Sequence, residues 1–233
     1  MAETLMLKPI ATIRSDFPEK FGIPRQSGIV RSLTAQIVFA PEYRNRDALR
    51  GLEGFSHLWL IWEFSKARRD SWSPTVRPPR LGGNTRMGVF ATRSPFRPNP
   101  LGLSCVRLEH IDCDTPEGPV ITVSGADLLD GTPIYDIKPY LPYCDAHPDA
   151  TGGFASGGFD HRLTVTVPDA LLSLVPAEKR EALIGVLQAD PRPTYQDDPA
   201  RIYGMGFAGL NVQFQVDGDR LTVTDITPKT NRL

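Results

Sequence analysis

Proline and glycine interrupt this chain so often that they largely decide what it can fold into. Its 233 residues include 22 Pro and 20 Gly, so proline makes up about 9% of the chain against a usual ~5%. Proline removes a backbone donor and fixes φ, and long helices are therefore not expected. The segments between these residues are short and rich in β-branched, aromatic and apolar side chains. We therefore predict a mainly β protein.

Seven segments within the first 140 residues have the length and composition of β-strands. Short strands separated by turns favour a β-barrel or a β-sandwich. The segment HLWLIWEF is apolar on both faces, as a central strand is. A short helix is expected over residues 46–52. The expected strands cover residues 10–14, 35–39, 57–64, 87–93, 103–111, 120–128 and 133–140.

The later part of the chain opens with a polar segment, CDAHPDATGGFASGG, at residues 144–158. This segment is rich in glycine and has no periodicity, which is typical of a linker or a mobile loop. Beyond it we expect a strand at 163–167 and a helix with Pro176 in its first turn and with Leu183, Val186 and Leu187 on one face. Two closing strands, 210–216 and 220–226, are joined through an Asp-Gly pair, which is a good hairpin signal.

These signals divide the chain into three parts. A β-barrel domain is expected over residues 1–145 and a flexible linker over residues 146–160. Residues 161–233 are expected to form a small α+β domain, because they combine one helix with several short strands.

The net charge of −1 conceals two halves of opposite sign. Residues 1–110 hold 17 Lys+Arg and 9 Asp+Glu, whereas residues 111–233 hold 9 and 18. Between Ser71 and Leu108 there are six arginines and no acidic residue. Planar guanidinium groups in this density suit the recognition of phosphate or carboxylate. The alternative is a solvated surface that pairs with the acidic half of the same chain.

Composition also excludes some classes of protein. No apolar run approaches the roughly 18 to 20 residues of a membrane span, and the first residues lack the basic and apolar parts of a signal peptide. A cytoplasmic location is therefore expected. The three cysteines, Cys105, Cys113 and Cys144, form no CxxC pair, so we predict buried free thiols rather than disulfides or zinc ligands. No metal site is expected.

The common catalytic signatures are missing from the sequence. It contains no GxGxxG, GxxxxGK[ST], HExxH or GxSxG motif. The four histidines, His57, His110, His147 and His161, are scattered without metal-ligand spacing and are expected to be structural or solvent-exposed.

A segment stiffened by proline is the strongest local signal that remains. Residues 76–104 carry five prolines, and they present Arg80, Asn84, Arg86, Arg93, Arg97 and Asn99. A rigid loop with so many donors is typical of a segment that grips a ligand. The alternative is a stiff barrel connection whose arginines cap backbone carbonyls. A second cluster, Asp127, Asp130 and Asp136, is compatible with a metal, with ribose hydroxyls or with a nearby cation.

Long strings of the sequence resemble one family. They are FPEKFGIPRQ, GLEGFSHLWLI, RPPRLGGNTRMGVFATRSPFRPNPLGLS, DLLDGTPIYDIKPYLP and DPRPTY. These strings are similar to the TsaA-like family, in particular to bacterial TrmO-type tRNA methyltransferases. The similarity extends from about Ile10 to Tyr195, which is most of the chain.

The resemblance implies a fold and a reaction. The fold is an N-terminal single-sheet β-barrel, unlike the Rossmann methyltransferases, with a small C-terminal domain in a homodimer. The reaction is S-adenosylmethionine-dependent methylation of the exocyclic nitrogen of threonylcarbamoyladenosine, the nucleoside that follows the tRNA anticodon. The tRNA anticodon loop is then the partner, and the absence of GxGxxG is no objection.

The resemblance also assigns residues to the cofactor. An arginine can bind the methionyl carboxylate, a carboxylate can bind the ribose hydroxyls, and backbone groups can read the adenine edge. The implied cofactor-binding residues are Pro24, Arg25, Gln26, Ser65, Lys66, Arg93, Leu103, Asp127, Leu128, Leu129 and Asp130.

Two residues are candidates to accept the proton that leaves the acceptor nitrogen, Asp136 and Tyr140. The alternative for them is that Asp136 orders a turn and Tyr140 packs. Tyr140 or Tyr195 is also a candidate to stack on an unpaired base. The candidates for phosphate contacts are Arg31, Arg80, Arg86, Arg97, Lys138 and Arg192.

Two other functions remain open at this level. A non-catalytic RNA-binding barrel needs the same arginines but no cofactor pocket. A metal-dependent enzyme would be built on Asp127, Asp130 and Asp136, and activity that survives chelation would exclude it.

Overall fold

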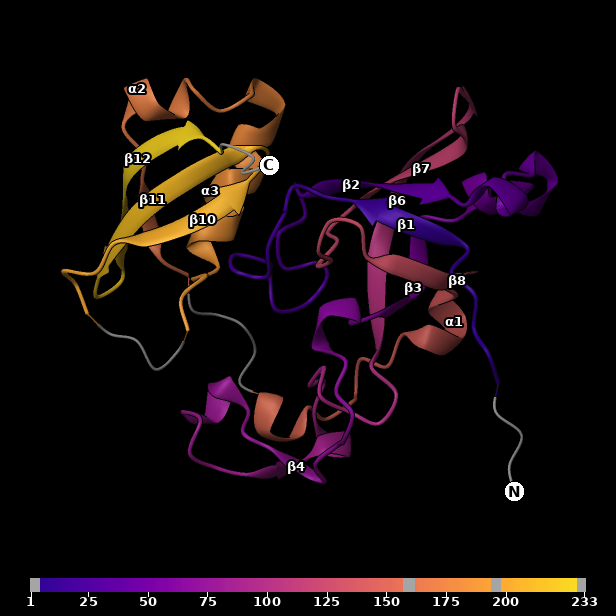
Figure 1. Cartoon of the computed structure of the whole chain (residues 1–233), viewed down its shortest axis with the longest axis horizontal. Coiled ribbons are helices and arrows are strands. Elements are labelled where there is room, and N and C mark those ends of the chain that lie inside the picture. Colours follow the sequence, from indigo (N-terminus) through magenta and orange to yellow (C-terminus); the bar gives the residue numbers. More distant parts are fainter. Residues whose placement is uncertain (1–4, 157–161, 194–197, 230–233) are drawn as a thin grey trace.

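The computed structural model describes residues 5–156, 162–193 and 198–229, and it contains a closed β-barrel beside a second sheet (Figure 1). Neighbouring barrel strands are antiparallel throughout, and β1 pairs with β8 to close the ring. The predicted mainly β fold with an N-terminal single-sheet barrel is confirmed. In barrel order the strands are β1 (Ala11–Arg14), β2 (Thr34–Phe39), β7 (Gly118–Ser124), β6 (Leu101–Thr115), β3 (His57–Glu63) and β8 (Pro133–Pro139).

Side chains fill the interior of the barrel. Residues alternate between the two faces of each strand, so that in β1 Ala11 and Ile13 are buried while Thr12 and Arg14 are exposed. The largest buried side chains come from all around the ring, and barrels of this size have no room left for a channel. A binding site must therefore lie at an end of the barrel or on its outside. The fully buried residues of the interior include Ile13, Ile37, Leu58, Leu60, Ile121 and Ile134.

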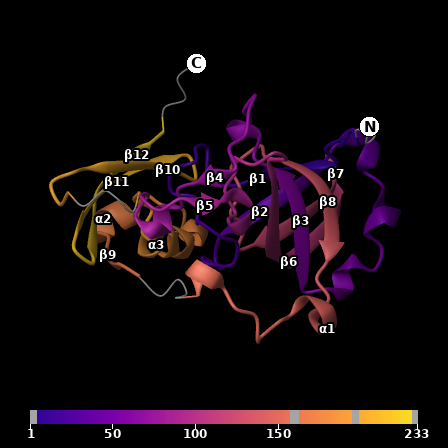
Figure 2. The ribbon, with the colours of Figure 1, turned by 90° about the horizontal axis from the view of Figure 1, so that it is seen from below.

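The C-terminal part is a four-stranded sheet covered by helices. Its order is β10 (Tyr203–Phe207), β11 (Leu210–Asp217), β12 (Arg220–Pro228) and β9 (Thr164–Thr166), with β9 parallel to β12. Figure 2 shows α3 (Arg180–Gln188) against this sheet. The predicted small α+β unit and its Asp-Gly hairpin are confirmed. Strand β10 was not expected, because its sequence YGMGF contains two glycines.

Helix α3 buries the side predicted from the sequence. Leu183, Val186 and Leu187 are at most 1% exposed and pack in the core of the C-terminal sheet. Pro176 precedes the 3₁₀ turn η8 (Ala177–Lys179), which leads directly into α3. A further short helix is α2 (Asp169–Leu172).

Two long connections leave the barrel at the end where β1 and β3 finish. The β1–β2 connection, residues 15–33, reaches across to the C-terminal sheet. The β3–β6 connection, residues 64–100, hangs below the barrel in Figure 1. Within it lie the short strands β4 (Thr75–Val76) and β5 (Met87–Gly88), together with the 3₁₀ turns η4 (Ser65–Ala67), η5 (Pro79–Leu81) and η6 (Val89–Ala91).

Some predicted elements are shorter than expected. The strand predicted over 87–93 exists only as β5, because the chain turns at η6, where the Thr92 N–H bonds to the Val89 carbonyl at 3.1 Å. The predicted helix over 46–52 is instead two 3₁₀ turns, since Gly51 between them has a φ of +88°. The remaining short elements are η1 (Pro41–Tyr43), η2 (Arg46–Leu49), η3 (Leu52–Gly54), α1 (Pro142–Asp145) and η7 (Gly153–Ala155).

The prediction of buried cysteines was wrong. All three thiols are free, but Cys105 and Cys113 are only half-buried and Cys144 is exposed. Cys105 lies on the outward side of β6, whose inward positions are Gly102, Ser104 and Val106, and Cys144 lies on the short helix α1. Within the described ranges, no helix is long and apolar enough to cross a membrane.

Candidate functional site

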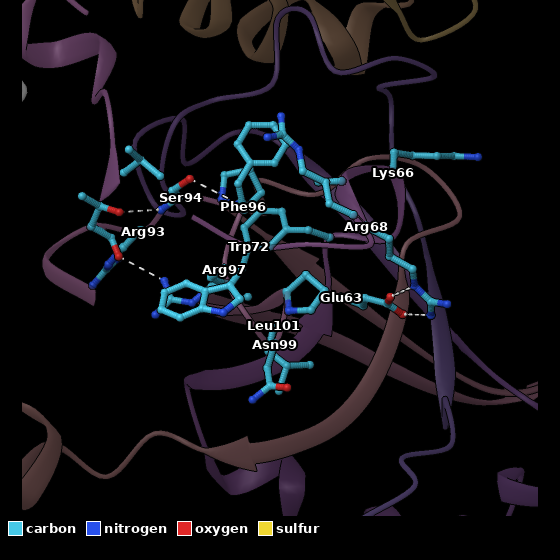
Figure 3. Close-up of a pocket in the computed structure, with 18 of the residues that line it drawn as sticks. Glu63, Lys66, Arg68, Trp72, Arg93, Ser94, Phe96, Arg97, Asn99 and Leu101 are labelled. Atoms are coloured by element: carbon cyan, nitrogen blue, oxygen red, sulfur yellow. Dashed lines mark hydrogen bonds and ion pairs between the residues drawn. The ribbon is translucent and has the colours of Figure 1, made fainter. Parts of the chain in front are cut away.

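A cavity of about 1770 Å³ lies at one end of the barrel, where β3 ends and β6 begins. Trp62 and Glu63 of β3 line it from the barrel side, together with the first residues of β6. The β3–β6 connection supplies most of the other lining, and the β1–β2 connection adds Ile23 to Gln26. Figure 3 shows the Glu63–Arg68 pair on one side of the cavity and Arg93 and Arg97 on the opposite side.

A tryptophan fixes the floor of this cavity. The indole of Trp62 packs on Gly102 so closely that a Cβ added there would lie 2.3 Å from the ring. Its Nε1 donates to Ser104 Oγ at 2.9 Å, and Ser104 Oγ donates to Asp127 Oδ1 at 2.6 Å. Trp62 and Ser104 therefore orient one oxygen of the Asp127 carboxylate.

Asp127 has the electrostatic character of a site residue. Burial raises the pKa of its carboxyl, while the bond from Ser104 and the charge of Arg93 partly oppose that shift. A carboxylate that is largely removed from water and faces a cavity gains from any donor or cation that enters it. Asp127 is thus suited to bind a hydroxyl, an amine or a cationic centre.

Glu63 anchors the opposite side. It is 5% exposed, and its carboxylate accepts hydrogen bonds from Arg68 Nε and from Arg68 Nη2, the latter to Oε2 at 2.8 Å. The Tyr135 hydroxyl also donates to Oε2, at 2.5 Å. The Arg68 guanidinium is the main cause that lowers the pKa of Glu63. These bonds hold the turn η4, which carries Lys66, whose carbonyl accepts from Lys20 Nζ at 2.8 Å. The sequence signal for this role was a single acidic residue at the end of an apolar strand.

Arginines surround the cavity, and their partners are known in several cases. Arg93 donates to Gln26 Oε1, and the guanidinium of Arg69 lies 3.6 Å from the ring centre of Phe96. Arg97 donates to the Thr92 carbonyl at 3.0 Å, as the alternative of carbonyl capping predicts. The lining includes Arg25, Arg68, Arg69, Arg77, Arg86, Arg93 and Arg97.

The structure brings together most of the residues that the sequence assigned to a cofactor. Leu128 does not line the cavity, since it is 1% exposed in the barrel core. Asp130 also lies away from the lining and accepts from the Ser15 N–H at 3.0 Å. The predicted residues that do line the cavity are Pro24, Arg25, Gln26, Ser65, Lys66, Arg93, Leu103, Asp127 and Leu129.

The two candidate proton acceptors do not line the cavity. Asp136 on β8 pairs with Lys138 Nζ at 2.9 Å. Tyr140 follows β8 and packs against Trp59 and His57, with ring centres 5.8 Å and 6.1 Å away. The packing of Tyr140 agrees with the alternative for that residue, whereas Asp136 lies within β8 rather than in a turn.

The residues predicted to contact RNA are dispersed. Arg86 and Arg97 line the cavity. Arg31 is exposed on the β1–β2 connection, and Lys138 pairs with Asp136. Arg192 is 9% exposed and forms a bidentate ion pair with Asp190, with Nε to Oδ1 at 2.9 Å and Nη2 to Oδ2 at 3.0 Å. Tyr195 and the side chain of Arg80 lie outside the described residues.

Sequence reasoning missed several residues of the site. Trp62 and Ser104 look like ordinary strand residues, and only their contacts reveal a role. Glu63 differs from its strand only in being acidic at the end of an apolar run. Trp72 and Phe96 line the cavity from the arginine-rich segment. In the part of the chain that the structure describes, no three His, Cys, Asp or Glu side chains are grouped so as to hold a metal ion.

Comparison with known proteins places the chain in a family. The tRNA-methyltransferase O N-terminal domain matches residues 12–146, and the TrmO C-terminal domain matches residues 161–229. The chain belongs to the tRNA-methyltransferase O family. A protein of Escherichia coli (strain K12), named tRNA (adenine(37)-N6)-methyltransferase, is 39% identical in an alignment of 234 positions that covers 97% of this chain and 99% of that protein.

Other family members are similar in sequence and in structure. A protein of the same name from Eikenella corrodens is 47% identical over 163 residues, covering 70% of this chain and 92% of its own. A crystal structure of TrmO from Pseudomonas aeruginosa matches with a TM-score of 0.78 at 35% identity, covering 97% of this chain and all of that one. As a member of the tRNA-methyltransferase O family, this chain is an S-adenosylmethionine-dependent tRNA methyltransferase.

Proposed function

We propose that this protein transfers a methyl group to the exocyclic N6 of the adenosine at position 37 of tRNA, and that this adenosine carries a threonylcarbamoyl group. The observation that carries the proposal is the cavity at the barrel end, where guanidinium groups, aromatic rings and the partly desolvated Asp127 converge. The names of the relatives support position 37 and N6. The family resemblance supports the threonylcarbamoyl group.

The residues of the cavity fit S-adenosylmethionine. When bound, this cofactor supplies a methyl group on a positively charged sulfur, and it also carries a carboxylate and ribose hydroxyls. The cavity volume is ample for a nucleoside cofactor. Arg25 or Arg93 suits the carboxylate, Asp127 suits a hydroxyl or the cationic end, and Leu129 offers backbone groups to an adenine edge. Burial raises the pKa of Asp127 where it lines the cavity, and a carboxyl with these two properties is typical of a binding site.

Catalysis in this site requires mainly alignment. Methyl transfer is a displacement on an activated carbon, so holding acceptor and donor in line at about 3 to 3.5 Å accounts for most of the rate. The acceptor nitrogen must also lose a proton. Asp136 and Tyr140 remain our proposed acceptors. Because neither lines the cavity, this role requires a water molecule to relay the proton from the acceptor nitrogen.

The direct test incubates the purified protein with S-adenosylmethionine and tRNA and then analyses the nucleosides by mass spectrometry. We expect a methyl group on threonylcarbamoyladenosine. Methylation of an adenosine that lacks the threonylcarbamoyl group would contradict threonylcarbamoyladenosine as the substrate. If neither nucleoside were methylated, the whole proposal would be contradicted. A non-catalytic RNA-binding barrel predicts that S-adenosylmethionine causes no thermal stabilisation.

A matched pair of variants tests the role of Asp127. Asp127→Asn keeps the acceptor for Ser104 but removes the charge, and we expect cofactor affinity to fall about tenfold or more, as for a lost bond to a charged group. Asp130→Asn is the control, because Asp130 does not line the cavity. Calorimetric titration of both variants measures the difference, and equal affinities would remove Asp127 from the site.

The organisation of the chain remains part of the proposal. Family matches on either side of residues 146–160 support a linker there. A homodimer is implied by the resemblance, and sedimentation of the purified protein tests it. A cytoplasmic location also stays a prediction.

A further inference from the structure

Two exposed aromatic rings flank the base of the β4–β5 hairpin. Trp72 precedes β4 and Phe90 follows β5, and the two strands pair Thr75 with Gly88. The ring centres are 6.1 Å apart, and the planes differ by 32°. Trp72 is 52% exposed and Phe90 is 73% exposed. These two rings form a partly paired apolar surface on the connection, and they are more exposed than its third exposed aromatic residue, Phe96, at 38%.

The backbone holds these rings in place without burying them. Val89, next to Phe90, is 1% exposed, and its N–H bonds to the Pro74 carbonyl at 2.9 Å. The chain is thus anchored on both sides of the hairpin while Phe90 points outward. Large aromatic side chains gain stability when they are buried, so two of them held in solvent at an anchored position indicate a partner rather than a fold requirement.

The charge around the rings determines which partner fits. Residues 71–108 contain six arginines and no acid, although Asp70 directly precedes them. On the hairpin itself Arg77 lines the cavity, and Arg86 is oriented by a 3.2 Å bond from Nη1 to Thr75 Oγ1. Aromatic rings among arginines suit a polyanion with exposed bases, which is single-stranded nucleic acid. In a two-fold symmetric contact, a second copy of this chain would bring the same basic segment against this surface, and the two positive charges would repel.

We propose that Trp72 and Phe90 form a stacking platform for an unpaired base of the tRNA loop. This inference rests on the proposed function, because it concerns the RNA that delivers the acceptor. Trp72 belongs to the cavity lining and Phe90 does not, so the platform runs from the cavity outward. A base stacked there is a neighbour of the nucleotide that enters the cavity, and the arginines of the hairpin lie where its phosphates would pass.

Tryptophan fluorescence tests the platform directly. The chain has three tryptophans. Trp62 is buried and Trp59 is half-buried with its Nε1 bonded to Asp145, so we expect tRNA to quench mainly Trp72, which is 52% exposed. Trp72→Phe should lose most of this quenching yet keep much of the affinity for tRNA. Trp72→Ala and Phe90→Ala should weaken tRNA binding about 5- to 100-fold, which is the range for one lost stacking contact. Tyr143→Ala is the control, because Tyr143 is 86% exposed on α1, outside the hairpin.

Three further measurements separate the outcomes. We expect the affinity for S-adenosylmethionine to be unchanged in Phe90→Ala and the KM for tRNA to rise while kcat is largely kept. The inference is overturned if Trp72→Ala weakens cofactor binding but not tRNA binding, because Trp72 then serves the cofactor. A changed oligomeric state in Trp72→Ala with unaltered tRNA affinity also overturns it. Failure of the wild-type protein to bind tRNA at all would instead refute the proposed function.

Discussion

The two long connections of the barrel both line the cavity, but they are held in opposite ways. The β1–β2 connection, residues 15–33, packs three side chains into the core of the C-terminal sheet: Phe17, Val30 and Leu33 are at most 4% exposed there. The β3–β6 connection, residues 64–100, adds no side chain to either of the two large cores, apart from Phe64 at its start.

Polar contacts also attach the β1–β2 connection to the C-terminal sheet and its helices. Asp16 pairs with Lys179 at 2.7 Å, and Glu19 receives both Lys229 Nζ at 3.0 Å and the Gly206 N–H at 2.9 Å. Arg25, which lines the cavity, donates to the Arg192 carbonyl at 3.2 Å. The segment that carries Pro24 to Gln26 is therefore fixed from the C-terminal side.

This difference suggests that the two walls of the cavity serve different ligands. The wall formed by the β1–β2 connection is part of a folded core and is preorganised for a cofactor of constant shape. The wall formed by the β3–β6 connection has few buried apolar side chains beyond Ala67 and Val89, so its local opening costs less than that of the β1–β2 connection. Such a wall suits a large substrate that must enter and leave in every turnover.

Identical glycine substitutions in the two connections should give the largest difference. Gly22 has a φ of +95°, and a Cβ there would lie 2.1 Å from the sulfur of Met205, which is fully buried. We expect Gly22→Ala to cost about 2 to 5 kcal/mol, from overpacking and the left-handed backbone together. Urea unfolding at neutral pH measures this loss.

The matched control is Gly82→Ala in the other connection. Gly82 has a φ of +70° but no atom within 4 Å of an added Cβ. Only the conformational penalty of about 1 kcal/mol remains. Equal losses in the two variants would mean that the β1–β2 connection is not packed more tightly than the β3–β6 connection.

A pair of valines should separate positioning from stability. Val30 of the β1–β2 connection packs on Gly185 of α3, where an added Cβ would lie 2.8 Å from Val30 Cγ1. Val223 lies in the same core but on β12. We expect Val30→Ala and Val223→Ala each to cost about 2 to 3 kcal/mol. Only Val30→Ala should also weaken cofactor binding several-fold, as calorimetry would show, and equal cofactor affinities would contradict the coupling.

The sequence predicted strands and hairpins well because these depend on local patterns. The strands predicted over 10–14 and 35–39 agree with β1 and β2 to within a residue at each end. The strand predicted over 120–128 ends early, at Ser124, because Gly125 has a φ of +75°. Turn-forming glycines are visible in a sequence, but their backbone conformation is not.

Long-range packing was not predictable in the same way. No pattern in residues 15–33 indicates that Phe17 contacts Phe207, with ring centres 5.7 Å apart, across 190 positions of sequence. Site residues were likewise predictable where a local motif contains them and not where only long-range contacts define them. Motif residues such as Arg93 and Asp127 line the cavity, whereas Glu63 could not be recognised until Arg68 and Tyr135 were placed around it.

The smallest expected effect compares, as a function of pH, one ion pair at each connection: Glu19 of the β1–β2 connection with Lys229, and Arg68 of the β3–β6 connection with Glu63 at the end of β3. Ion pairing lowers the pKa of Glu63, chiefly through Arg68, and the pKa of Glu19, chiefly through Lys229. A folded-state pKa below the unfolded value of about 4.3 stabilises the protein above that pH, and this contribution is lost as the pH falls through the folded-state pKa. Glu63→Gln should therefore cost about 1.5 kcal/mol at pH 7 and Glu19→Gln less than about 1 kcal/mol, since Glu63 is buried and Glu19 is half exposed. Urea unfolding should show both penalties shrinking in acid, and a penalty for Glu63→Gln that persisted there would mean that the carboxylate acts through packing rather than charge.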